Sequence, residues 1–112
     1  MNEYSKKIRK RLKELTALAY QRELDTELKL LHEKFNDWEN GKTNCFELNE
    51  HIHKFHNGTS KEIWKKYNYT DPDMIVSSAV AFEILKRDEV PEETLDIIDR
   101  RVKLIQEINE DK

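Results

Sequence analysis

Residues that break helices are scarce in this chain, and their positions divide it into segments. The 112 residues include two glycines and two prolines, which are Gly41, Gly58, Pro72 and Pro91. The long stretches between them are rich in Glu, Lys, Leu and Arg, a composition that favours helix over strand. No run of alternating apolar and polar residues indicates a strand. The sequence therefore predicts an all-α fold.

The first segment predicts one long helix from Ser5 to Asn40, with Gly41 as its C-terminal stop. Its apolar residues form two rows with the same spacing, which are Ile8, Leu12, Leu15 and Ala19, and then Leu24, Leu28, Leu31, Phe35 and Trp38. At about 100° per residue, the two rows lie on nearly opposite sides of a straight helix. No Pro or Gly is present to bend it. We therefore expect the two halves to pack against different bodies.

Two capping-box spacings predict the next two helices. Asn44 with Glu47 opens a helix that runs to about His56, and Asn57-Gly58 is expected to end it. Thr59 with Glu62 opens a short helix whose expected core residues are Ile63, Trp64 and Tyr67.

Pro72 and Pro91 mark the starts of the last two helices. Asp71 before Pro72 is suited to cap a helix of which most sides are apolar, and such a helix is usually central. Its residues available for burial are Ile75, Val76, Ala79, Val80, Phe82 and Leu85. The helix after Pro91 carries one apolar row of Leu95, Ile98, Val102 and Ile105, and a second row of Ile97, Leu104 and Ile108 on its far side. We expect a compact five-helix bundle that forms a single domain over residues 1–112.

Three of the four histidines lie in one short segment, residues 51–56. Glu50-x-x-His53 has the spacing of di-iron ligands, but such a site needs a second pair, and the chain has no other Glu-x-x-His. Glu50, His53 and His56 could hold a single zinc ion. The alternative is structural, because histidine near a helix C-terminus interacts favourably with the helix dipole. If a site exists here, we expect His53 and His56 to face inward, with Glu62 orienting an imidazole.

The start of the chain is a basic arm on an otherwise acidic body. The net charge is −3, yet six basic residues precede Glu14, namely Lys6, Lys7, Arg9, Lys10, Arg11 and Lys13. Such an arm can bind nucleic acid or anionic lipid without reading sequence, or it can pair with an acidic patch on another copy. A helix-turn-helix around Gly58, with Lys61, Lys65, Lys66 and Tyr67 facing DNA, is a further alternative. It fits poorly, since the positions flanking the turn are polar.

The segment around the histidines also resembles a small uncharacterised family of bacterial helical proteins. The shared pattern is Ile52-His53-x-Phe55-His56-x-Gly58 with Glu62-x-Trp64 and Tyr67, and it extends back to Tyr20, Glu23-Leu24, Phe35 and Trp38. The resemblance implies no activity. It supports only the treatment of residues 53–58 as one unit.

Neither a signal peptide nor an apolar stretch long enough to cross a bilayer is evident, and Cys45 is the only cysteine. We therefore expect a cytoplasmic protein without a required cofactor. The leading interpretation is a non-enzymatic interaction or regulatory module that forms a homodimer, since both the first and the last helix have more apolar rows than one core can use. The alternatives are a small metal- or His-dependent hydrolase centred on His53 and His56, and non-specific nucleic-acid binding through the basic arm.

Overall fold

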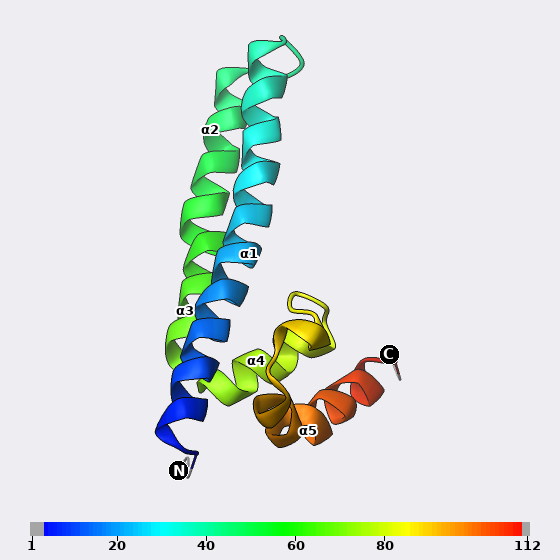
Figure 1. Cartoon of the computed structure of the whole chain (residues 1–112). Coiled ribbons are helices and arrows are strands. Elements are labelled where there is room, and N and C mark those ends of the chain that lie inside the picture. The colour runs from blue at the N-terminus through cyan, green and yellow to red at the C-terminus, as the bar shows by residue number, and fades with distance from the viewer. Residues whose placement is uncertain (1–3, 111–112) are drawn as a thin grey trace.

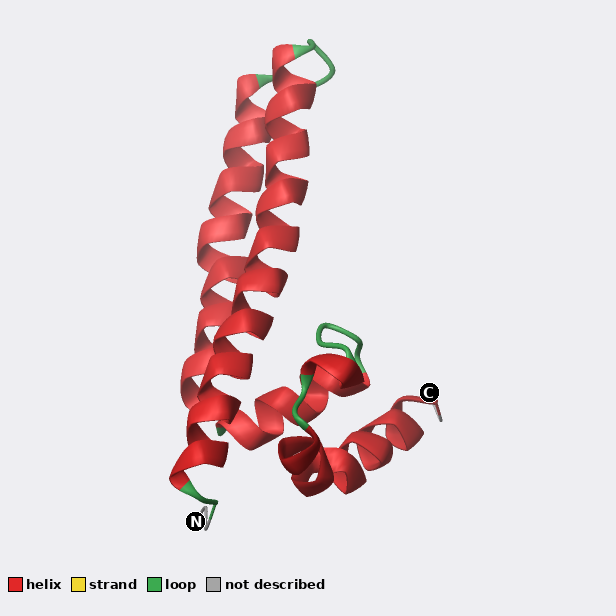
Figure 2. Cartoon of the chain, viewed as in Figure 1, coloured by secondary structure: helices red, strands yellow, loops and turns green. Residues whose placement is uncertain are grey.

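The computed structural model describes residues 4–110, and no strand occurs among them (Figure 2). The longest element is helix α1, Lys6–Glu39. Its N-cap is Ser5, whose side chain accepts a hydrogen bond from the backbone N–H of Ile8, and Asn40 and Gly41 follow its last turn. Gly41 has a φ of +73°, which glycine adopts at little cost. Both ends of the helix lie where the sequence predicts them, and the all-α prediction is confirmed.

A second long helix runs antiparallel beside α1 (Figure 1). It consists of α2, Cys45–Lys54, a π-helical turn η1, Phe55–Ser60, and α3, Lys61–Tyr69. At its start the Asn44 side chain accepts a hydrogen bond of 2.9 Å from the backbone N–H of Glu47, as the capping box predicts.

The prediction that a helix ends at Asn57-Gly58 is wrong. Gly58 has no positive φ, and Thr59 lies inside the π-helical turn instead of capping a new helix. The second and third predicted helices are therefore one continuous helix, so residues 4–110 hold four helices instead of five.

The π-helical turn changes the phase of this continuous helix by one residue. In an uninterrupted α-helix Tyr67 would lie about 100° around the axis from Leu48. One extra residue in the turn returns Tyr67 to the side of Leu48. Both side chains are buried, and α2 and α3 both contact α1. The turn thus keeps one face of the continuous helix against α1 along its whole length.

Helices α4, Pro72–Ala81, and α5, Glu92–Glu110, pack against the N-terminal half of α1 (Figure 1). Helix α4 contacts both α1 and α5, which is the central position predicted for it. The hydrophobic core lies here and consists of Leu12, Leu15, Ala19, Ile63, Tyr67, Ile75, Val76, Ala79, Val80, Leu85, Val90, Ile98 and Val102. Leu12, Leu15 and Ala19 of the first apolar row of α1 are therefore buried as expected, and Ile8 is partly buried. Trp64 and Phe82, predicted to be buried, are 47% and 53% exposed.

Helix α4 ends in a Schellman motif. The backbone N–H of Ile84 donates to the carbonyl of Ala79 at 2.8 Å, and that of Glu83 donates to the carbonyl of Val80 at 3.2 Å. The residue in the left-handed conformation is Glu83, with a φ of 63°, where glycine is usual. A short 3₁₀ turn, η2, Arg87–Glu89, then leads to α5.

The molecule is more extended than the compact bundle expected from the sequence. Its radius of gyration is 17.4 Å, against about 13 Å for a globular chain of this length. The extents are 53 × 32 × 23 Å, because the hairpin of α1 with α2 projects beyond the core (Figure 1). None of the helices in residues 4–110 combines the length and the apolar content needed to cross a membrane.

Candidate functional site

The predicted histidine site lies on the outer surface of the continuous helix. His53, His56 and Glu50 are all exposed, so the expectation that both imidazoles face inward is wrong. Glu50 and His53 line one shallow, open hollow together with Lys54, Asn57 and Gly58. The physical reason is the missing turn: without a break at Gly58, no second helix folds back over these side chains.

The structure does not bring the other predicted members to this hollow. His56 does not line it, and Glu62 lines a separate hollow with Glu23, Thr59 and Lys66. Among residues 4–110, no three His, Cys, Asp or Glu side chains are grouped so that they could hold a metal ion. The zinc site on Glu50, His53 and His56 therefore has no support in this geometry, and neither has a hydrolase centred on the two histidines.

The residues of the basic arm form the first two turns of α1 and are all exposed. Lys7 pairs with Glu93 at 3.6 Å, and Arg11 pairs with Glu14 at 3.3 Å. The other four make no ion pair within residues 4–110 and share one face at i, i+3, i+4 and i+7, namely Lys6, Arg9, Lys10 and Lys13. The helix-turn-helix alternative is wrong, because residues 55–60 form a helical turn and Tyr67 is buried.

An apolar cavity of about 210 Å³ lies where α1, α3 and α4 meet. Its apolar lining includes Met74, Ile75, Ala79, Phe82 and Ile84. Three of its polar lining residues are hydrogen-bonded to one another. Glu23 accepts hydrogen bonds from Lys66 Nζ at 2.6 and 2.8 Å and from the Tyr67 hydroxyl at 2.8 Å.

The environment of Tyr67 keeps its hydroxyl protonated. Burial, together with the hydrogen bond to Glu23, raises the pKa of Tyr67 above its usual range. Its ring stacks on Tyr20, with the centroids 4.8 Å apart. These hydrogen bonds and the stacked rings hold α3 on α1.

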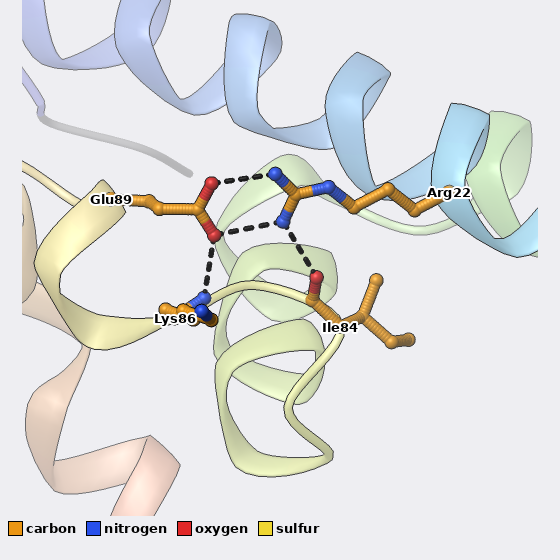
Figure 3. Close-up of polar contacts among 4 residues, drawn as sticks. All are labelled: Arg22, Ile84, Lys86 and Glu89. Carbon is orange, nitrogen blue, oxygen red and sulfur yellow. Dashed lines mark hydrogen bonds and ion pairs between the residues drawn. The ribbon is translucent and has the colours of Figure 1, made fainter.

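Arg22 joins α1 to the loop between α4 and α5 (Figure 3). Its guanidinium donates to both carboxylate oxygens of Glu89, at 2.8 and 2.6 Å, and to the carbonyl of Ile84 at 2.9 Å. Glu89 also accepts a hydrogen bond of 2.9 Å from the backbone N–H of Lys86. These hydrogen bonds, which we call the clamp of Arg22, hold the loop between α4 and α5 on α1, close to the start of the projecting hairpin.

That projecting part, which we call the distal hairpin, comprises residues 23–39 of α1 and helix α2. The second apolar row of α1 lies here and meets only one neighbouring helix. Leu48 of α2 is buried against it, but Leu28, Phe35 and Trp38 remain 43%, 36% and 43% exposed. Two helices alone cannot enclose a core, so apolar side chains stay at the surface.

One row along α1 is exposed at every position. Its members in the C-terminal half follow a four-three-four-three-four spacing and are Gln21, Asp25, Leu28, His32, Phe35 and Glu39. We call this set the exposed row. Its middle positions are Leu28, His32 and Phe35, while the carboxylates of Asp25 and Glu39 stand nearer its ends.

Sequence reasoning did not identify the partners of Tyr67 or the clamp of Arg22. Glu23 and Lys66 lie 43 positions apart, and Arg22 and Glu89 lie 67 apart, so no local spacing could reveal either pair. The exposed row does have a local signal, because Leu28 and Phe35 belong to the apolar row already evident in the sequence.

Comparison of the chain with protein-family models, with curated proteins and with solved structures gave no match. The resemblance to a bacterial helical family therefore stays a prediction.

Proposed function

We propose that this protein is a non-enzymatic interaction module that self-associates through the distal hairpin. The observation that carries the proposal is the exposure of Leu28, Phe35 and Trp38 on a part of the chain that has only two helices. Large apolar side chains grouped on one projecting element usually mark an interface. The distal hairpin has no third helix to cover it within residues 4–110.

Association of two such hairpins would supply the missing layer. Antiparallel helix pairs that pack together form four-helix bundles, in which the inner faces of all four helices become buried. Each fully buried Leu or Phe side chain would gain about 1.5–3 kcal/mol relative to exposure. The half-exposed side chains here would gain part of that amount each.

The test is the solution mass of the wild type and of a Leu28→Gln/Phe35→Gln variant, measured by sedimentation velocity over a range of micromolar concentrations. We expect the wild type to sediment at twice the monomer mass and the variant to sediment as a monomer. Circular dichroism should show that both keep the same helix content, since neither position belongs to the buried core.

Helix α5 offers a matched control. Leu104 and Ile108 are 54% and 53% exposed, so Leu104→Gln/Ile108→Gln removes a similar amount of exposed apolar surface elsewhere. The control should remain a dimer. A wild type that stays monomeric at high micromolar concentration contradicts self-association, and a control that dissociates while the hairpin variant does not would move the interface to α5.

Non-specific binding of nucleic acid is a second candidate, favoured by the exposed face of Lys6, Arg9, Lys10 and Lys13, which form no ion pair with the described residues 4–110. Contacts to phosphates would give affinity without sequence preference and would weaken steeply with salt. Fluorescence anisotropy with two unrelated duplexes should give equal affinities, both reduced by Lys6→Gln/Lys10→Gln/Lys13→Gln and little changed by Lys61→Gln/Lys65→Gln. Preference for one duplex at physiological salt that survives removal of residues 1–13 would refute it.

A further inference from the structure

We infer that the partner of the exposed row is a second copy of this chain in antiparallel orientation, with the two-fold axis crossing α1 near His32. The inference rests on the proposed self-association and adds its geometry. It follows from the symmetry of the exposed row, from the distribution of charge along both long helices, and from the face that α4 and α5 leave open.

The apolar part of the exposed row is self-complementary under a two-fold axis. Leu28 and Phe35 stand at nearly equal distances on either side of the position between Leu31 and His32. A two-fold axis perpendicular to α1 at that position places each Leu28 opposite the Phe35 of the second copy. An isologous interface requires this kind of self-matching patch.

Charge along α1 opposes the alternative parallel arrangement. Residues 6–22 contain seven basic residues and one acidic residue, a net charge of +6, whereas residues 23–39 have a net charge of −4. Parallel packing would lay the whole of α1 along its copy, basic half against basic half. The antiparallel arrangement overlaps only the distal hairpins and leaves the basic halves at opposite ends of the dimer. It also brings the two acidic halves together, with Asp25 of each copy close to Glu39 of the other, so it removes the repulsion between the basic halves but keeps that between the acidic ones.

The continuous helix of α2 and α3 favours the same orientation. Helix α2 has a net charge of −1, from Glu47 and Glu50 against Lys54, and helix α3 has a net charge of +2, from three lysines against Glu62. Reversal about the two-fold axis brings the acidic α2 of one copy to the level of the basic α3 of the other. Complementary charges of this kind select orientation more than they add affinity.

The rest of the molecule leaves this side of the hairpin accessible. Towards the N-terminus the same row continues through Lys7, Lys10, Glu14 and Ala17, all of which are exposed. The buried side of α1, which faces α4 and α5, carries Leu12, Leu15 and Ala19 instead. Another hollow between α1 and the continuous helix is lined by Leu30, Leu31 and Phe55 together with the charged side chains of Glu27, Lys34 and Lys54, so an apolar interface there would also have to bury three charges.

Disulfide trapping distinguishes the two orientations. In a Cys45→Ser background, which removes the one native, exposed cysteine, we place cysteine at two exposed positions of the row, Asp25 and Glu39. In the antiparallel dimer, position 25 of one copy lies within one residue, or about 1.5 Å along the axis, of the level of position 39 of the other. Two equivalent positions 25, or two equivalent positions 39, are then about 20 Å apart along the axis. A disulfide needs Cα atoms within about 7 Å of each other.

The double variant Asp25→Cys/Glu39→Cys should therefore form a covalent dimer under mild oxidation, with a 25–39 linkage identified by mass spectrometry of its peptides. Each single variant should stay uncrosslinked. A single variant that crosslinks to itself overturns the antiparallel orientation, and a stable dimer without any crosslink overturns the exposed row as the interface. A wild type that sediments as a monomer instead contradicts the proposed function itself.

Discussion

Arg22 on α1 and Glu89 in the turn before α5 form a bidentate ion pair, with N–O distances of 2.8 and 2.6 Å. The hydrogen bonds from Arg22, together with the one from the backbone of Lys86, lower the pKa of Glu89 to about 2. The pair joins residues at distant points in the sequence and fixes the loop after α4 on the first helix.

This pair makes stability depend on pH below neutrality. Because the pKa of Glu89 is lower in the folded state than its ordinary value of 4.5, its contribution is complete above about pH 5. It is lost as the pH falls towards 2. Thermal unfolding followed by circular dichroism should show that Glu89→Gln lowers the Tm at pH 7 and flattens the decline of Tm between pH 5 and pH 2. The control Glu33→Gln, an exposed carboxylate in the middle of α1, should follow the wild-type curve; a Glu89→Gln curve parallel to wild type would contradict this account.

Deletion of Asn57 should be tolerated, because it removes the extra residue of the π-helical turn. The helix then becomes a regular α-helix, and Leu48 and Tyr67 still share one face. Deletion of Lys65, equally exposed, should instead rotate Tyr67 by about 100° relative to Leu48, away from α1, and break its hydrogen bond to Glu23. We expect a Tm near that of wild type for the first deletion and a large decrease for the second. Equal losses from both deletions would show that the turn does not set the phase.

Ile97 and Ile98 are neighbours of the same type with opposite environments. Ile98 is 0% exposed and Ile97 is 36% exposed. Ile98→Ala should lower the free energy of unfolding by about 2–5 kcal/mol, since it leaves a cavity in the core, and Ile97→Ala should cost less than about 1 kcal/mol. Urea denaturation measures both values. Similar costs at the two positions would mean that α5 does not pack as described.

Glu83→Gly should stabilise the fold. The left-handed conformation of Glu83 costs a residue with a Cβ about 1 kcal/mol more than glycine, and the exposed side chain of Glu83 makes no hydrogen bond or ion pair within residues 4–110. We expect the midpoint of urea denaturation to rise with an unchanged slope. Glu83→Ala should not reproduce the gain, because alanine retains the Cβ; a gain of equal size from alanine would point to charge instead of conformation.

Local signals in the sequence predicted much of the fold. Ser5, Asn44 and Pro72 each mark the start of a helix, and Gly41 marks the end of α1. The two rows on α1 correctly predicted two different surroundings for its halves. These features depend on neighbours within about four residues, so the sequence displays them directly.

The continuous helix could not be predicted in the same way. Asn57-Gly58 has the composition of a helix end, but contact of Leu48, Ile63 and Tyr67 with α1 outweighs that local preference. The wrong prediction that His53 and His56 face inward followed from this error, because an inward orientation needed a bend that does not occur. The ion pairs of Arg22 and Glu23 depend on the packing of remote segments, which periodicity does not reveal.

The unbroken length of α1 has a mechanical consequence. One rigid rod of 34 residues is embedded in the core at its first half and extends from the clamp at Arg22 to the tip of the hairpin, a distance of about 25 Å. A rotation of α1 by about 5° near Arg22 would therefore move the tip of the hairpin by roughly 2 Å. In the same way, a force on the tip would be transmitted through α1 to its contacts with α4 and α5. A partner bound at the hairpin would therefore be coupled mechanically to the core through α1, close to the ion pair of Arg22 and Glu89.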